Sequence, residues 1–305
     1  MLKMESEHLK TNNTMQKVKI YQVDAFTDRL FAGNPAAVCI LNDWISDELM
    51  QSIGNENNLS ETAFVVPVGR DFEIRWFTPT VEVDLCGHAT LAAAFVLFNL
   101  HHYPDAIIRF RSRRSGWLAV EKKDDMYFLD FPTDTLEKLT EEHHATIEKC
   151  IGMKPKELYK GKTDYMAVID SEKSLRILQP DFIEISKLNA RALIVTAKGD
   201  DVDFVSRCFG PQSGVNEDPV TGSAHTSFLP FWAKKLGKNN LIANQLSKRG
   251  GQLVCEYKND RCLIGGKARL YMTGELHNLR DVGKVKEVSI IKAEKTDLEA
   301  ILNKQ

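Results

Sequence analysis

Three absences limit the kind of protein that this sequence can encode. Its 305 residues include 40 basic and 42 acidic side chains, so no excess of positive charge attracts nucleic acid or an anionic membrane. No stretch reaches the roughly 18 uninterrupted apolar residues that span a bilayer, and the first residues lack a hydrophobic signal core. We therefore expect a cytoplasmic protein that binds a small molecule, with neither nucleic acid nor a membrane as a partner.

Cysteines at metal-binding spacing are absent as well. The six cysteines are spread thinly, with no C-x-x-C pair and no histidine at metal-ligand spacing. They are Cys39, Cys86, Cys150, Cys208, Cys255 and Cys262. We predict reduced thiols and no metal site.

What the sequence does contain is a pattern that occurs twice. Short strand-like runs from Val18 onward lead to an apolar segment at residues 84–100, and further strands follow. The second half repeats this order, with its apolar segment at residues 218–236. We therefore expect two similar halves, each a curved sheet wrapped around one central buried helix.

The same pattern predicts how the chain is divided. Residues 1–14 are polar and without periodicity, which is typical of a disordered leader. We place an N-terminal domain at residues 15–132 and a C-terminal domain at 133–282. The tail, residues 283–305, is expected to pack back on the N-terminal domain.

The two apolar segments begin alike. Gly87-His88-Ala89 and Gly222-Ser223-Ala224 share a Gly-x-Ala core, with Asp84 and Asp218 a few residues upstream. Helix N-termini present unpaired N–H groups and the positive end of the helix dipole, and glycine lets a ligand approach the backbone. Two such N-termini facing one cleft would form an anion receptor. Alternatively, the glycines only relieve crowding where each helix enters a tight core.

Glu61 is the first candidate for proton transfer. It lies directly before an apolar strand, where a glutamate is most often simply solvated. Its neighbours Leu59, Ala63 and Phe64 would instead remove water from the carboxyl group. Desolvation raises a carboxyl pKa toward the range in which the group both accepts and returns protons near neutral pH.

Three further side chains each allow two interpretations. Asp218 precedes Pro219, a typical helix-cap signal, but its carboxylate could also reach the cleft as an acid–base partner. His88 is either a core histidine bonded to a backbone carbonyl, or a protonated or hydrogen-bonding group beside the substrate. Cys86 is either an inert buried thiol or a thiolate whose pKa the helix N-terminus lowers.

Read together, these motifs resemble the phenazine biosynthesis-like (PhzF) family. The resemblance runs in family order from about Lys17 to Leu276 and rests on six motifs. They are Asp24-Ala25-Phe26-Thr27, Gly33-Asn34-Pro35-Ala36, Leu59-Ser60-Glu61-Thr62, Trp76-Phe77-Thr78-Pro79, Leu85-Cys86-Gly87-His88-Ala89-Thr90 and Glu217-Asp218-Pro219-Val220-Thr221-Gly222-Ser223-Ala224.

The resemblance implies a fold and an activity. The fold is the α+β fold of diaminopimelate epimerase, in which two pseudo-symmetric domains each wrap a barrel-like, mostly antiparallel sheet around a central buried helix. The site lies between the domains, and the usual state is a homodimer. The activity of characterised members is the isomerisation of a dihydro-hydroxyanthranilate, without metal or cofactor, by a proton shift between ring carbons.

The resemblance also assigns roles to residues. Glu61 matches the family's acid–base glutamate, and His88, Asp218 and Ser223 match residues grouped around the substrate. Epimerases of this fold use two opposed cysteines, but here Thr221 stands opposite Cys86. A hydroxyl group is far too weak an acid to replace a thiolate, which favours transfer by one base.

Our hypothesis from the sequence is therefore a cofactor-independent isomerase acting on a small carboxylate-bearing metabolite. Glu61, His88 and Asp218 are the predicted catalytic residues. The predicted substrate-binding residues are Gly87, Ala89, Gly222, Ser223 and Ala224. Two alternatives remain: a racemase or epimerase that uses Cys86, and a non-catalytic metabolite-binding or interaction protein on the same fold.

Overall fold

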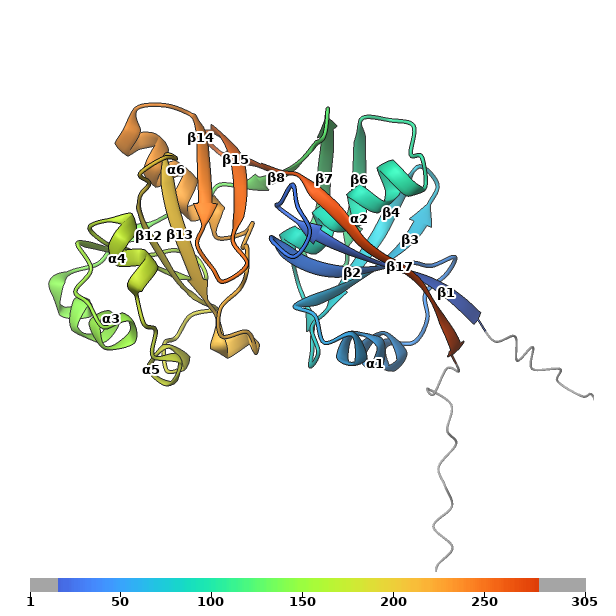
Figure 1. Ribbon diagram of the computed structural model, residues 1–305, viewed down its shortest axis with the longest axis horizontal. Helices are drawn as coiled ribbons and strands as arrows, with labels where there is room; N and C mark the ends of the chain where they lie inside the picture. Colours follow the sequence, from blue (N-terminus) through green and yellow to red (C-terminus); the bar gives the residue numbers. More distant parts are fainter. Residues whose placement is uncertain (1–15, 280–305) are drawn as a thin grey trace, which may run out of the picture.

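The computed structural model describes residues 16–279. The elements follow one another in two runs along the chain, and the two runs form two halves that lie side by side (Figure 1). The first run comprises β1 (Gln16–Ala25), β2 (Asn34–Ile40), α1 (Asp47–Asn57), β3 (Glu61–Val68), β4 (Asp71–Phe77), β5 (Glu82–Val83), α2 (Gly87–Leu100), β6 (Ile107–Ser112), β7 (Gly116–Lys123) and β8 (Met126–Pro132). The predicted leader at 1–14 and the tail at 283–305 lie outside the described residues.

The second run begins after β8. It comprises β9 (Glu137–Lys138), the 3-10 helix η1 (Glu141–His143), α3 (His144–Ile151), β10 (Glu157–Lys160), β11 (Tyr165–Val168), α4 (Glu172–Ile177), α5 (Phe182–Ser186), β12 (Leu193–Lys198), β13 (Phe204–Phe209), η2 (Pro211–Ser213), α6 (His225–Leu236), β14 (Asn240–Gln245), β15 (Gly251–Lys258) and β16 (Arg261–Gly266). A last strand, β17 (Ala268–Leu279), leads back to the first run (Figure 1).

Strands pair in the same order in both runs. From β8 the successive neighbours are β7, β6, β4, β3, β2, β1 and β17, and from β16 they are β15, β14, β13, β12, β11, β10 and β9. The parallel pairs also fall at matching places: β6 with β4 and β3 with β2 in one run, β14 with β13 and β12 with β11 in the other. This agreement confirms the predicted pseudo-symmetric halves. Antiparallel pairing of β8 with β16 joins them into one sheet.

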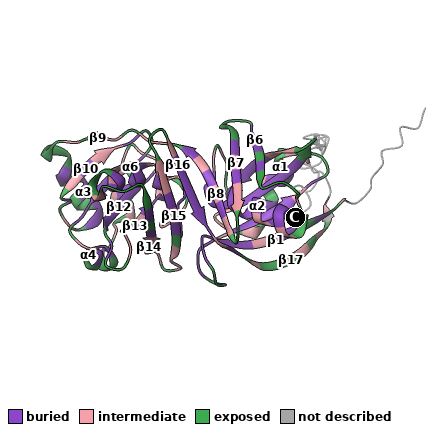
Figure 2. Cartoon of the chain, turned by 90° about the horizontal axis from the view of Figure 1, so that it is seen from above, coloured by how far each residue is buried: buried purple, intermediate pink, exposed green. Residues whose placement is uncertain are grey.

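The two matching helices differ in how deeply they are buried. Eleven of the fourteen residues of α2 are buried, as expected for a helix with no polar face beyond its first turn (Figure 2). α6 occupies the equivalent place between β13 and β14, but only six of its twelve residues are buried, and Lys234 and Lys235 are exposed. The N-terminal half therefore encloses its helix more completely. Within residues 16–279, no helix is long and apolar enough to cross a membrane.

α6 begins later than the sequence predicts. The pair Asp218-Pro219 is a typical cap signal, yet the helix starts at His225, and the carbonyl of Gly222 accepts the N–H of His225 at 3.0 Å in the turn before it. Asp218 therefore caps no helix, and the cap interpretation is wrong. Only residues 222–224 form a turn before the helix, and the carboxylate of Asp218 bonds to side chains instead.

The chain returns to the first half earlier than expected. β17 pairs with β1 from Val18 opposite Leu276 to Ala25 opposite Ala268. The residues of β17 lie within the range 133–282 that was predicted for the C-terminal domain, yet they pair with a strand of the first half. β17 therefore belongs to the sheet of the first half, a pairing with no local signal in the sequence. The division at residues 132 and 282 stays a prediction.

Candidate active site

The two glycine turns meet where the halves join. A β-carbon built on Gly87 would lie 3.6 Å from the Cα atom of Gly222, and one built on Gly222 would lie 3.8 Å from the Cα atom of Gly87. The start of α2 and the turn before α6 therefore abut. The first N–H groups of α2, at Gly87 and Ala89, have no partner within the helix, and those of Gly222 and Ala224 lie across the junction.

Glu61, at the start of β3, lies beside this junction. Its side chain is only 16% exposed, and its Oε2 atom is 3.2 Å from the Nε2 atom of His88. The pKa of the Glu61 carboxyl is raised to about 8, mainly by burial and secondly by the negative charge of Asp218. A hydrogen bond with the Cys86 side chain and the positive charge of Arg191 oppose this rise. A carboxyl group with this pKa both binds and releases a proton near neutral pH.

His88 contacts Asn34, which sequence reasoning treated only as a turn residue. The amide nitrogen of Asn34 lies 2.9 Å from the carbonyl of Val220 and 2.7 Å from Asp218, so it must be the NH₂ group, since those oxygens accept. Nδ1 of His88 lies 3.1 Å from the same nitrogen and 3.5 Å from Sγ of Cys86. The other ring nitrogen, Nε2, lies on the side of Glu61.

Protonated His88 is disfavoured. Burial lowers the pKa of His88 to about 3, so the ring is neutral at physiological pH. The interpretation of His88 as a hydrogen-bond donor remains, and its partners are side chains rather than the backbone carbonyl expected for a core histidine.

Of the two interpretations of Cys86, the structure favours the inert buried thiol over the thiolate. Burial and the charge of Glu61 raise the pKa of Cys86 well above its usual value. The expected lowering by the helix N-terminus is therefore outweighed, because the thiol is buried beside a carboxyl group. A protonated Cys86 is a poor base.

Asp218 forms the opposite side of the site. It accepts hydrogen bonds from the hydroxyl of Thr221 and the amide of Asn34, which joins it to His88 across the junction. Burial raises the pKa of Asp218 to about 6, whereas those two hydrogen bonds and the charge of Arg191 oppose the rise. The structure thus brings Glu61, His88 and Asp218 together. Asp84, the other upstream aspartate, is instead exposed and paired with Arg114.

Sequence reasoning missed Arg191. This residue lies two positions before β12, in a stretch without a motif, and its side chain is 37% exposed. Its Nη1 atom donates to the Ser223 hydroxyl at 2.8 Å, and its Nε and Nη2 atoms bind both carboxylate oxygens of Asp164. An arginine is thereby fixed beside the predicted substrate-binding serine. The only signal for Arg191 in the sequence is the repeat of the two halves, in which β12 is equivalent to β3.

Glu61, Cys86 and His88 are also the one group among the described residues that could hold a metal ion, with ligand atoms within 4.8 Å of one another. Their protonation does not suit a metal. Cys86 has a raised pKa, and Nδ1 of His88 is already in contact with Asn34 and with the thiol of Cys86. The donor set fits proton transfer better than metal ligation.

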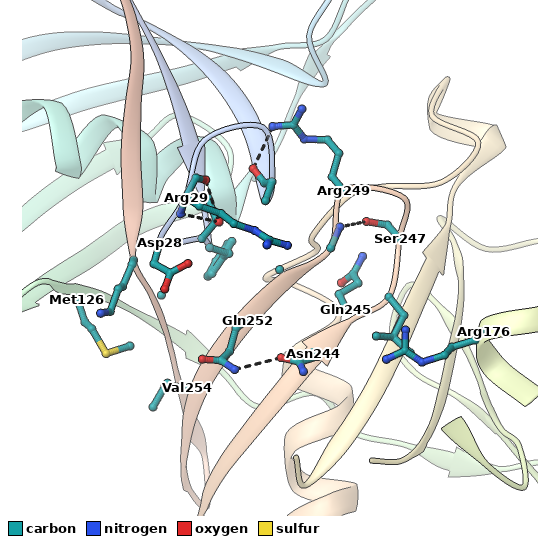
Figure 3. A pocket seen from close by; sticks show the side chains of 18 residues that line it. Asp28, Arg29, Met126, Arg176, Asn244, Gln245, Ser247, Arg249, Gln252 and Val254 are labelled. Carbon is teal, nitrogen blue, oxygen red and sulfur yellow. Dashed lines mark hydrogen bonds between the residues drawn. The ribbon is translucent and has the colours of Figure 1, made fainter. Parts of the chain in front are cut away.

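A separate hollow is lined by residues of both halves. It has a volume of about 560 Å³ and includes Phe26, Arg29, Gln245, Arg249 and Gln252 in its wall (Figure 3). None of the predicted catalytic residues lines it. Gln245 nevertheless links this hollow to the site, because its side chain accepts from the N–H of Thr221 and donates to the carbonyl of Asp218.

Comparison with known proteins places this geometry in a family. Residues 23–274 match the family model described as phenazine biosynthesis-like protein. An uncharacterized isomerase of Pseudomonas aeruginosa is 50% identical over 263 residues, covering 86% of this chain and 99% of that protein. A crystal structure of a PhzF family protein from Enterococcus faecalis superimposes with a TM-score of 0.82 at 47% identity, covering 86% of this chain and 99% of the other.

The fold extends to epimerases. A hydroxyproline epimerase from Agrobacterium vitis, solved with bound trans-4-hydroxy-L-proline, has a TM-score of 0.55 at 9% identity, covering 86% of this chain and 92% of that one. At this identity the likeness concerns the fold alone. It confirms the predicted epimerase-like architecture of two pseudo-symmetric halves.

Proposed function

This chain belongs to the phenazine biosynthesis-like family and is an enzyme of the isomerase class, and we propose that it moves one proton between two carbon atoms of a small carboxylate-bearing metabolite. In this proposal Glu61 is the single acid–base group. The neighbouring His88 and Asp218 orient it and the substrate. The reaction needs no net proton, since the one removed is returned.

One observation carries the proposal. Glu61 is a nearly buried carboxyl group with a pKa raised to about 8, and its Oε2 atom lies 3.2 Å from the Nε2 atom of His88. The pKa of a general acid–base catalyst is most effective near the working pH. Near pH 7 such a group is ionised in roughly one molecule in ten, yet each ionised group is a stronger base than an exposed glutamate.

Unpartnered polar atoms support a polar ligand at this place. Oδ1 of Asn34, Oε2 of Glu61 and Nε2 of His88 are buried and make no well-directed hydrogen bond within the described residues. The last two lie close together but are poorly aligned. Buried polar atoms normally have hydrogen-bond partners, so a substrate with several oxygen or nitrogen atoms would supply the partners that these three atoms lack.

The reaction then follows in two steps. Ionised Glu61 removes a proton from carbon, and the electron pair left behind spreads into the conjugated carboxylate or carbonyl group of the substrate. N–H groups at the glycine turns, at Gly87 and Ala89 on one side and Gly222 and Ala224 on the other, stabilise that negative charge. Protonated Glu61 then returns the proton to a second carbon, which forms the isomer.

The test is solvent exchange on identified ligands. Small cyclic and amino carboxylic acids are screened for thermal stabilisation of the protein, and each ligand found is incubated with the protein in D₂O. We expect deuterium at carbon, detected by NMR and mass spectrometry, and an isomeric product.

Two variants give the experiment its control. Glu61→Gln keeps the size of the side chain but removes its basicity, and should abolish the exchange. Glu56→Gln makes the same chemical change on the exposed face of α1 and should leave it intact. Ligands that stabilise the protein but exchange no carbon-bound hydrogen would instead support a metabolite-binding protein.

A further inference from the structure

The second half contributes a charged group to the junction that the proposed function does not use. The pairing of Thr62 with Phe77 and of Leu193 with Phe209 aligns β3 with β12, and places Arg191 one residue before the position equivalent to Glu61. Each residue reaches the side chain that follows the glycine of its own half. Glu61 contacts His88, and Arg191 contacts Ser223.

Arg191 retains hydrogen-bonding capacity. Of its five N–H groups, Nε and one on Nη2 bind Asp164, and one on Nη1 binds Ser223. One N–H on each Nη atom has no partner among residues 16–279. The side chain as a whole is 37% exposed, and these two donors have no partner among these residues that a ligand would have to displace.

Ser223 is oriented by the same contact. Its hydroxyl oxygen accepts from Arg191, so its own hydrogen is free to be donated, and no acceptor for it lies among the described residues. Asp164, only 4% exposed, binds Arg191 through both carboxylate oxygens and fixes the plane of the guanidinium group. The plane of donors is therefore set before a ligand arrives, which limits the ordering cost of binding.

We propose that Arg191 and Ser223 form an oxyanion subsite that binds the carboxylate of the substrate on the side opposite Glu61. The proposal rests on the proposed function, because it names the anchor of that same site. A carboxylate held there by two guanidinium N–H groups and the serine hydroxyl directs the rest of the molecule toward Glu61. Backbone N–H groups at the glycine turns remain available for charge that develops during the reaction.

Binding of benzoate, a rigid monocarboxylate, tests the subsite without requiring turnover. Isothermal titration calorimetry compares benzoate with the uncharged benzyl alcohol for each folded variant. Hydrogen bonds to charged groups contribute roughly 1.5–3 kcal/mol, so Arg191→Met should weaken benzoate binding about 10- to 100-fold. Arg191→Lys keeps the charge without the planar donor set and should restore part of the affinity.

The matched control is Arg261→Met. Arg261 is 41% exposed and also pairs with a carboxylate, that of Asp130, but it lies at the β8–β16 pairing and forms no hydrogen bond with Ser223. Its removal should leave benzoate affinity unchanged. Ser223→Ala should weaken binding, and combining it with Arg191→Met should add little, because the two groups act as one unit.

Three results would overturn the subsite: no saturable benzoate binding by the folded wild-type protein, equal binding of benzyl alcohol, or unchanged affinity in Arg191→Met. Failure of the proposed function looks different. Arg191-dependent benzoate binding without Glu61-dependent deuterium exchange supports the subsite and contradicts the isomerase mechanism. Glu61-dependent deuterium exchange together with benzoate binding that does not depend on Arg191 supports the isomerase mechanism and contradicts the subsite.

Discussion

The two glycine turns occupy equivalent places in the two halves and have opposite chemistry. On the first, Gly87 is flanked by Cys86 and His88, both of which are neutral because burial disfavours their charged forms, and it faces Glu61 with its raised pKa. On the second, Gly222 is flanked by Thr221 and Ser223 and faces Asp218 and Arg191.

This difference shows how a repeated fold supports a reaction with one base. Both halves supply backbone N–H groups from equivalent turns, so either could bind an anion. The first half places Glu61 beside its turn, with a carboxyl pKa raised to about 8 and an unpartnered Oε2 atom. The second half places there Asp218, whose pKa is also raised, to about 6, but whose carboxylate already accepts two hydrogen bonds, together with the fixed cation of Arg191. Removing groups from one side at a time separates proton transfer from binding.

The largest effect is expected from Glu61→Gln. A positioned acid–base group contributes about 10²- to 10⁴-fold in rate, so turnover of an identified substrate should fall by that factor. Substrate binding should change far less, because the anchoring groups lie on the second side. Steady-state kinetics on wild type, Glu61→Gln and Glu56→Gln measure this. Near-full turnover in Glu61→Gln would remove Glu61 from its assigned role.

Stability should respond to the same change. The unfolded glutamate ionises near 4.5 and the folded one near 8, so between these values the native state binds more protons and the wild type loses stability as pH rises. Glu61→Gln lacks this penalty. The free energy of unfolding of Glu61→Gln, relative to that of the wild type, should therefore rise by an amount on the order of a few kcal/mol from pH 5 to pH 8, since one pKa unit corresponds to about 1.4 kcal/mol.

Urea unfolding of both proteins at pH 5 and pH 8 provides the measurement. The contribution of buried His88 is present in both proteins and largely cancels in the difference. A stability difference that does not change with pH would mean that the carboxyl of Glu61 ionises as freely in the folded protein as in the unfolded chain.

The smallest effect is expected from Cys86→Ala. Because burial keeps this thiol protonated, its removal should reduce turnover less than about tenfold, below the range of a general acid–base group. Deuterium exchange should survive. Complete loss of exchange in a folded Cys86→Ala protein would revive the racemase alternative and weaken the contrast between the two sides.

Local patterns in the sequence were enough to find the residues of the first side. Glu61 stood before an apolar strand and His88 stood in a glycine turn, so both were marked by their neighbours. The burial of α2 followed from the absence of polar residues beyond its first turn.

Long-range contacts explain what the sequence did not reveal. Asn34 contacts His88 and Val220 across 54 and 186 positions, and Arg191 reaches Ser223 across 32. The start of α6 was misplaced because Asp218 and Pro219 imitate a cap, while the hydrogen bonds of Asp218 go to side chains brought in by tertiary packing. The return of β17 to β1 likewise depends on tertiary pairing.

The most direct test of the contrast needs no substrate. The carboxyl carbon of Glu61 can be followed by NMR in protein labelled with ¹³C at glutamate, and assigned by its absence from Glu61→Gln. We predict a titration midpoint at about pH 8 for this carboxyl group. A midpoint near 4.5, the ordinary value for an exposed glutamate, would contradict it.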